Sequence, residues 1–358
     1  MSRFNLSRKR LVVIGAVVIA VGLLGAVVAV AAGGDGGDDT AGGTGNTTTT
    51  STSTTTTTLP PIAPLTGLFA DPAKIARPAI IVKIDNAPAA LRLQEGVDRA
   101  DIVVVEQVEG AATRMAAVFQ SQDAEPGPIR SARTSDLAIA PSFGLPLFTN
   151  SGGNAGVIDE VRRSDALVDA GIGSSGAAAI FNKYKRGTGV HRFFVPIEEL
   201  YALRAGEGRP PEPLFPFRPV GQPAAGEPIA GVDVVYGRGG TRVHYEWDGQ
   251  GWARSQDGRV HAMANGGPRI APANVIVMST TYVDSGYVDV GGNKSPEAVL
   301  EGGGEALIFT GGKLIRGQWR GIDQGGRVSF VDGLGLPVAL SPGQTFIELS
   351  TPGGAAPF

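Results

Sequence analysis

The hydrophobic positions divide the chain into three parts with different patterns. Residues 11–32 form one uncharged stretch rich in Val, Ala, Leu and Ile. Residues 62–205 alternate short apolar runs with segments of helical periodicity. From residue 229 to 352 the apolar runs stay short, are separated by glycine turns and show almost no helical periodicity. The pattern predicts a membrane-spanning helix, an α/β domain and a mostly antiparallel β domain, in that order.

The uncharged stretch 11–32 has the length and the flanking charge of a membrane anchor. As a helix it would extend about 33 Å, enough to cross a hydrocarbon core of ~30 Å. Basic residues precede it within the segment 1–10, namely Arg3, Arg8, Lys9 and Arg10. This asymmetry predicts a cytoplasmic N-terminus, a single pass through the cell membrane and a body outside the cytoplasm. Because Ala29–Ala31 resembles a cleavage site, secretion after removal of a signal peptide is the alternative.

Residues 33–61 lack the apolar side chains that a folded core requires. A Gly- and Asp-rich run is followed by a Thr/Ser tract over residues 47–58. Such a segment buries too little apolar surface to offset the loss of chain entropy, so it is expected to be disordered. The composition predicts an exposed stalk between the membrane and the folded body, of the Thr/Ser-rich kind that carries O-glycosylation sites.

Residues 62–205 are expected to form a mixed sheet with flanking helices. The run Ile102–Val105 is apolar at consecutive positions, as in a strand that is covered on both faces. The expected strands are 79–85, 102–109, 114–120 and 145–150, and the expected helices are 134–140, 155–163 and 197–204.

Seven prolines between residues 206 and 228 predict a linker between this domain and the β-rich domain 229–352. Within the second domain, Asp248-Gly249 between two tryptophans is a hairpin signal. The expected strands there are 232–236, 242–247, 251–254, 275–281, 306–309, 328–331 and 345–349.

Polar side chains gather where the first predicted strand ends. Lys83 and Asp85 lie two residues apart and therefore on one face, where they can form an ion pair. Asn86 follows directly. Asp85 is a candidate catalytic residue, and Lys83 and Asn86 are candidate ligand-binding residues; a structural salt bridge at the end of the sheet is the alternative.

A second group flanks the end of the next predicted strand. Glu106 and Glu109 are three residues apart, so a regular strand would point their side chains to opposite faces. They converge only if the strand ends or bulges near residue 108. Paired carboxylates can act as acid and base, which makes both catalytic candidates. Thr113 and Arg114 follow the intervening turn and are candidate ligand-binding residues, unless Glu and Arg simply pair with each other.

A third group contains Arg130, Ser131 and Arg133. If a helix begins near Ser131, the two arginines share one face of it. Guanidinium groups bind carboxylate or phosphate in bidentate fashion, so this group predicts anion binding. Helix capping with internal ion pairs is the alternative.

The turn Ser151-Gly152-Gly153 leads from a predicted strand into the predicted helix 155–163. Glycines at this place let backbone N–H groups approach an anion, although the spacing is that of neither a Walker loop nor a Rossmann fingerprint. His191 and Arg192 stand in a glycine-rich loop. His191 is a fourth catalytic candidate and Arg192 a ligand-binding candidate, although a lone His beside an Arg is more often an ordinary hydrogen-bonded residue.

Composition excludes several kinds of site. The sequence contains no cysteine, which rules out disulfides, thiolate metal sites, a cysteine nucleophile and a lipid-modified cysteine. Three histidines make a histidine-rich metal centre improbable, so neither a metal nor a cofactor is expected. The net charge of −3 argues against nucleic acid as a partner.

Short motifs in both halves occur in an order that resembles one bacterial family. They include Pro64-Leu65-Thr66-Gly67-Leu68, Ile84-Asp85-Asn86, Val108-Glu109-Gly110, Gly127-Pro128-Ile129-Arg130-Ser131-Ala132-Arg133, Gly317-Gln318-Trp319 and Gly335-Leu336-Pro337-Val338. They resemble the YerB-like lipoproteins, which are classed by domains of unknown function. The resemblance covers about residues 64–350 and implies an exported, envelope-associated protein of two domains without an established activity.

Three features of the chain depart from that family. The family's usual lipid anchor needs a cysteine, so anchoring here is expected to fall to the helix 11–32. The family segment Arg-Pro-Gln-Ser-Gly reads Arg-Leu-Gln-Glu-Gly over residues 92–96. The typical Pro-His-Asn is Val190-His191-Arg192, which puts a fixed asparagine partner for His191 in doubt.

The sequence favours one function and leaves two alternatives. The favoured hypothesis is a membrane-tethered envelope protein that binds an anionic cell-wall or envelope component. One alternative is an envelope hydrolase or transferase acting on a phosphate- or sugar-containing substrate. The other is a scaffold whose β domain docks another envelope protein. Exposure of Trp247, Trp252 or Trp319 in one apolar patch would support it, but burial of all three in the domain core is the expected outcome.

Overall fold

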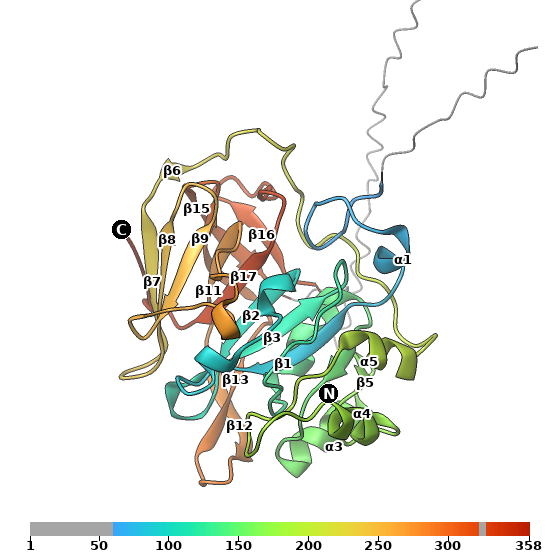
Figure 1. Cartoon of the computed structure of the whole chain (residues 1–358). Coiled ribbons are helices and arrows are strands. Elements are labelled where there is room, and N and C mark those ends of the chain that lie inside the picture. The colour runs from blue at the N-terminus through green and yellow to red at the C-terminus, as the bar shows by residue number, and fades with distance from the viewer. Residues whose placement is uncertain (1–59, 322–326) are drawn as a thin grey trace, which may run out of the picture. The chain divides into compact units, whose positions relative to one another are not determined.

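A mixed sheet runs through the part of the chain that the computed structural model describes, residues 60–321 and 327–358 (Figure 1). It contains strands from both halves of the chain, with the short β6 (Glu227–Pro228) paired to β15. The other strands, in spatial order, are β16 (Ser329–Asp332), β15 (Lys313–Arg320), β14 (Gly303–Thr310), β11 (Asn274–Ser279), β17 (Thr345–Ser350), β2 (Ile102–Gln107), β3 (Thr113–Phe119), β1 (Ile80–Asp85), β4 (Leu147–Thr149) and β5 (Val168–Asp169).

The two halves of the chain meet inside this sheet. β2 pairs in parallel with β17, with Val104 beside Ile347. Residues 102–105 are buried, and alternate members belong to the apolar layers on the two faces, as the continuous apolar run predicted. The proline-rich segment 206–228 does not separate two bodies, because Phe215 is buried and the carbonyl of Pro216 accepts a 2.9 Å hydrogen bond from Leu340.

Strand direction determines which loops lie together. β1, β4 and β5 are mutually parallel, and β11, β17 and β2 are mutually parallel. The two sets point the same way because β3 is antiparallel to both β1 and β2. The carboxyl ends of these six strands therefore share one edge of the sheet, which we call the carboxyl edge.

One face of the main sheet is covered by a second, antiparallel sheet. Val103, Val105 and Phe346 of the main sheet pack in one apolar cluster with Tyr245 and Trp252 of the second. The strands of the second sheet are β10 (Arg259–Val260), β9 (Trp252–Gln256), β8 (Arg242–Trp247), β7 (Gly231–Val235) and β18 (Ala355–Pro357), in spatial order. The second half is thus mostly antiparallel, with β11, β17 and β2 as the parallel exception.

A buried polar network joins the two sheets. Glu348 of β17 accepts hydrogen bonds from the hydroxyls of Tyr236 and Tyr245, both at 2.5 Å. The guanidinium of Arg254 lies 3.8 Å from the same carboxylate and 2.7 Å from Nδ1 of His261. Burial, followed by the charge of Arg254, holds the pKa of His261 well below its usual value. This network orients the second sheet on the first.

The helices are few and short. α2 and α3 pack on the face of the main sheet opposite the second sheet, through Ile139 and Val157. α4 and α5 pack on the other face, through Phe181 and Leu200. The five are α1 (Pro72–Ile75), α2 (Ser135–Ile139), α3 (Ala155–Arg163), α4 (Ala177–Lys183) and α5 (Ile197–Leu203) among the described residues. The expected helices at 134–140, 155–163 and 197–204 are present, whereas α4 was not predicted.

A hairpin of β12 (Tyr282–Val288) and β13 (Lys294–Ala298) extends from the carboxyl end of β11 and lies beside α3 (Figure 1). The hydroxyl of Tyr287 donates to Glu160 at 2.6 Å, and the amide of Asn154 donates to the carbonyl of Val288 at 3.0 Å. This hairpin was not predicted from the sequence.

Within residues 60–321 and 327–358, no helix is long and apolar enough to cross a membrane. The predicted anchor 11–32 and the predicted stalk up to residue 59 lie outside the described residues.

Candidate functional site

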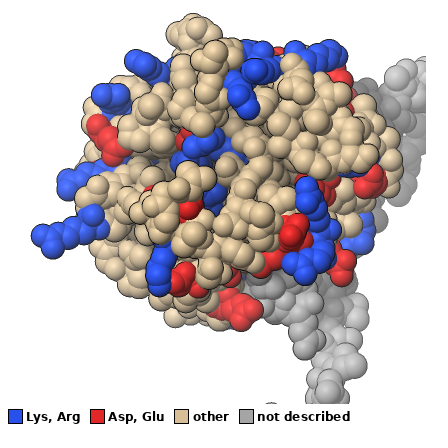
Figure 2. All heavy atoms as spheres, turned by 90° about the horizontal axis from the view of Figure 1, so that it is seen from below, with Lys and Arg blue, Asp and Glu red and all other residues tan. Residues whose placement is uncertain are grey.

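The carboxyl edge brings together polar segments that are far apart in sequence. The backbone N–H of Arg130 donates to the carbonyl of Lys83 at 2.8 Å, and that of Ser151 donates to the carbonyl of Arg130 at 2.9 Å. Residues 128–132 therefore lie between the end of β1 and the turn after β4. Figure 2, which views the side where α3 and β12 lie in Figure 1, shows basic side chains in a recess of this face with acidic ones beside them.

Lys83 and Asp85 lie on the same face of β1, as predicted, but the predicted ion pair between them is wrong. Lys83 is fully buried, and its Nζ contacts Glu106 of β2 and lies 2.8 Å from Oδ1 of Asp136. The residue between Lys83 and β2 is Ala116 of β3, whose methyl side chain leaves room for the lysine to cross. Lys83 is thus a structural cation beneath the recess.

Asp136, at the start of α2, had no expected role. Burial raises its pKa to about 7; Lys83 opposes this shift and Glu106 adds to it. In the unfolded chain the pKa of this carboxyl is near ~4, so the folded protein binds the proton more tightly than the unfolded chain does. The protonated carboxyl therefore stabilises the fold most below pH ~4. This contribution is lost as the pH rises toward 7.

Asp85 forms the centre of the recess. Its carboxylate is buried and accepts a 3.1 Å hydrogen bond from the backbone of Ala87. Arg114 Nη1 lies 3.2 Å from Oδ1, while Arg130 Nε and His191 Nδ1 each lie 2.9 Å from Oδ2. One carboxylate therefore gathers side chains from β3, from the segment before α2 and from the loop before α5.

Two of the groups around Asp85, Arg130 and His191, are partly exposed, whereas Arg114 is buried. The side chains of Arg114, Arg130 and His191 are 9%, 23% and 26% exposed, against 0% for Asp85. Burial lowers the pKa of Arg114; Asp85 opposes this, and the nearby charges of Arg130 and Arg133 lower it further. Two guanidiniums thus share one carboxylate here, and each repels the other.

Glu106 and Glu109 do not form a carboxylate pair. β2 ends at Gln107, and Glu109 lies in a 3-10 turn, where Arg133 Nη2 is 2.7 Å from Oε2 and the hydroxyl of Ser295 donates to Oε1. Burial alone would raise the pKa of Glu109, but these hydrogen bonds leave it below its usual value. Glu106 therefore pairs with Lys83, and Glu109 pairs with Arg133.

The predicted helical face of Arg130 and Arg133 is also wrong. Both residues precede α2, which begins at Ser135, and Arg133 turns to Glu109 while Arg130 turns to Asp85. The half-buried Ser131 lies between them. An extended backbone separates the two guanidiniums because the N–H groups of residues 130 and 132 bond to β1 and to the turn after β4.

Three other candidates lie away from the Asp85 cluster. Asn86 donates to the hydroxyl of Thr113 at 2.7 Å, and its carbonyl accepts from Gln256 of the second sheet, so both residues lie on the opposite face. The guanidinium of Arg192 stacks over the ring of Phe193 at 4.8 Å. These contacts stabilise the fold around the recess, and the three side chains do not line it.

Gly152 and Gly153, in the predicted turn Ser151-Gly152-Gly153, line a cavity of about 270 Å³. Gly152 has a φ of 109°, which explains the glycine there, and its N–H donates to Asn150. The cavity is also lined by Asp159, Asp169 and Arg162. The predicted turn is present, but carboxylates share its cavity, which weakens it as an anion site.

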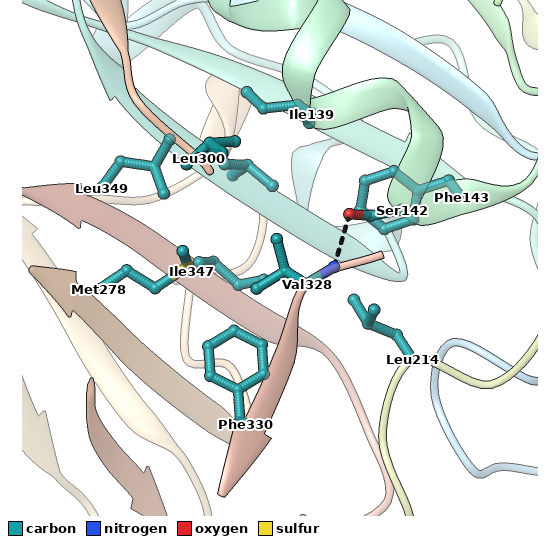
Figure 3. Close-up of a pocket in the computed structure, with 11 residues that line it drawn as sticks. Ile139, Ser142, Phe143, Leu214, Met278, Leu300, Val328, Phe330, Ile347 and Leu349 are labelled. Carbon is teal, nitrogen blue, oxygen red and sulfur yellow. Dashed lines mark hydrogen bonds between the residues drawn. The ribbon is translucent and has the colours of Figure 1, made fainter. Parts of the chain in front are cut away.

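A second pocket, on the α2 face of the sheet, is apolar (Figure 3). Its volume is about 20 Å³, and the N–H of Val328 donates to the hydroxyl of Ser142 at 3.4 Å across it. This is space for about one water molecule, too little for an organic ligand. We assign it to core packing.

The tryptophans do not form an exposed patch among the described residues. Trp252 and Trp319 are buried, and Trp247 is half-buried with its ring centre 5.0 Å from that of Trp252. Docking through these three residues therefore has no structural support.

Comparisons with known proteins agree with the motifs. Residues 65–209 match the family "Protein of unknown function (DUF3048) N-terminal domain", and residues 232–347 match the corresponding C-terminal domain. The chain is 29% identical over 298 residues to a Bacillus subtilis (strain 168) protein named "Putative lipoprotein YerB", covering 80% of this chain and 85% of that one. The crystal structure of YerB from Bacillus subtilis superimposes with a TM-score of 0.69 at 25% identity, over 83% of this chain and 99% of that one.

Proposed function

The chain belongs to the two-domain family of proteins of unknown function designated DUF3048, and from this premise we propose that it is an envelope-attached protein that binds an anionic envelope component through Arg114 and Arg130. The name of the relative, "Putative lipoprotein YerB", supports the envelope location. The two guanidiniums that share one carboxylate at the carboxyl edge support the binding activity.

One observation carries the proposal: two guanidiniums share a single buried carboxylate. Asp85 neutralises one of the two charges, Arg133 pairs with Glu109, and Lys83 lies between Glu106 and Asp136, whose pKa is raised to about 7. While Asp136 holds its proton, about one positive charge is therefore left for a ligand. This balance favours a group with a single negative charge, such as a phosphodiester or a carboxylate, over a doubly charged phosphate monoester.

The location of the pair is also suited to ligand binding. In α/β sheets, ligands usually lie outside the carboxyl ends of the strands, and Arg130 follows a segment bonded to the end of β1. Arginine holds planar or tetrahedral oxyanions through two parallel N–H bonds. A repeating anionic polymer of the envelope, with one charge per unit, fits these requirements best.

For attachment we propose that residues 11–32 cross the cell membrane once and that the body after residue 33 lies outside the cytoplasm. The basic residues before this stretch support the orientation. Alkaline phosphatase fused after Phe358, which is active only outside the cytoplasm, should be active and remain in the membrane fraction. Activity of a cytoplasm-specific reporter at the same position contradicts export, and activity in the medium indicates cleavage instead.

The binding proposal predicts the effect of Arg130→Gln. Binding of the full-length protein in detergent to poly(glycerol phosphate), measured by titration calorimetry, should weaken about 10- to 100-fold, since a charge-assisted hydrogen bond contributes ~1.5–3 kcal/mol. Because Arg130 is partly exposed, the variant should still fold, which a thermal melt checks.

Arg259→Gln is the matched control, because Arg259 is exposed on β10 of the second sheet. It should bind as the wild type does. Polygalacturonate in a parallel titration separates carboxylate from phosphodiester preference. Equal affinities for the wild type and the Arg130 variant with both polymers would contradict the proposal.

A further inference from the structure

Of the four predicted acid–base candidates, three are unavailable to a ligand in the recess. Asp85 and Glu106 are fully buried, and Glu106 contacts Lys83. Glu109 is held by Arg133 and Ser295. His191 is different, because its ring is 26% exposed while Nδ1 faces a buried carboxylate. Within residues 60–321 and 327–358, neither ring nitrogen takes part in a hydrogen bond: Nδ1 lies 2.9 Å from Oδ2 of Asp85 without hydrogen-bond geometry, and Nε2 belongs to the partly exposed ring.

We propose that His191 is the general base of a hydrolytic reaction on a phosphodiester, with Asp85 as its positioning residue; this rests on the anion binding proposed above. A carboxylate at Nδ1 favours the tautomer with the proton on that nitrogen and leaves the lone pair on Nε2. The imidazole and the two guanidiniums surround one carboxylate, so we expect a diester held by Arg114 and Arg130 to lie within reach of the imidazole.

The proposed step requires only water as the second reactant. A water oxygen forms a bond to phosphorus while His191 Nε2 takes its proton. The bond from phosphorus to the leaving oxygen breaks, and the imidazolium returns the proton to that oxygen. One phosphodiester and one water become one phosphate monoester and one alcohol, with no change in oxidation state. Arg114 and Arg130 stabilise the second negative charge that develops on the phosphoryl oxygens.

The local backbone suits a residue that meets a ligand. His191 lies in a loop closed by the bridge between Lys185 and Phe193, and the loop contains Gly187 and Gly189 with φ of 62° and 70°. The imidazole lies beside Asp85 of β1, and the same carboxylate is contacted by Arg114 of β3 and by Arg130 of the segment before α2. The dyad thus joins a fixed carboxylate on the sheet to an imidazole on a surface loop.

The test uses the full-length protein in detergent with poly(glycerol phosphate) as substrate. Release of phosphate monoester, followed by 31P nuclear magnetic resonance, should be detectable with the wild type. His191→Asn should lower kcat by about 10²- to 10⁴-fold with little change in KM, the usual range for loss of a general base. Arg130→Gln should instead raise KM. The acidic limb of the wild-type pH profile should be absent from the residual activity of the His191 variant.

His244→Asn is the matched control, because His244 Nδ1 lies 2.8 Å from Asp233 in a comparable pair that is exposed on the second sheet. Its activity should equal that of the wild type. A polymer that binds without release of monoester overturns catalysis and leaves the binding proposal intact. Absence of binding overturns both proposals. Cleavage that His191→Asn leaves unchanged overturns the role of His191.

Discussion

Replacing Lys83 with methionine should lower the free energy of unfolding by about 3–5 kcal/mol, because a buried ion pair that loses one partner leaves its charge uncompensated. Lys83 is fully buried between Glu106 and Asp136, and methionine keeps its length without its charge. Urea denaturation at pH 7.5 measures the loss. Lys185→Met, at an exposed lysine, is the control and should have almost no effect.

The same variant should recover part of its stability in acid. Asp136 has a raised pKa and takes up a proton as the pH falls, after which it no longer needs the cation. The difference between wild type and variant should therefore be smaller at pH 5 than at pH 7.5. A loss below ~1 kcal/mol at pH 7.5, or a difference that grows in acid, would contradict the buried triad.

Replacing Arg254 with methionine should cost about 3–5 kcal/mol in the free energy of unfolding for a related reason. The change leaves Glu348 buried between two tyrosine hydroxyls with no cation beside it, and it removes the donor to His261 and Gln256. Urea denaturation again provides the measurement. Arg259→Met, on the neighbouring exposed strand, is the matched control.

A double-mutant cycle tests whether Arg254 stabilises the fold through the charge of Glu348. If Glu348 is the group left uncompensated, Arg254→Met combined with Glu348→Gln should be less destabilising than the sum of the two single changes, by at least ~1 kcal/mol. Strict additivity would assign the cost to lost packing and not to charge.

Features that depend on local periodicity could be predicted from the sequence. The run of apolar residues before Asp85 predicted β1 and placed Lys83 and Asp85 on one face, because side chains alternate along a strand. Ala155–Arg163 is helical as expected, with Asn154 as its N-cap. The short motifs also identified the family correctly, because a family is defined by short stretches of sequence that follow one another in a fixed order.

Local periodicity could not predict which charged side chains pair with one another in the recess. Lys83 reaches Glu106 and Asp136 because Ala116, a small residue 33 positions along the chain, happens to lie opposite it in β3. Ser295 reaches Glu109 from a hairpin of the other half, whose strands are polar and largely exposed and therefore lack the apolar alternation that marks a strand. Such contacts depend on register and topology.

The central position of β17 has a consequence for how the protein is made. This strand is synthesised after β2 and β11, yet it lies between them in the middle of the main sheet. Until it arrives, both neighbours present open backbone edges that can pair with other chains. High contact order of this kind slows folding. A nascent or truncated chain that ends before residue 345 is thus expected to be the aggregation-prone form, until β17 has been synthesised.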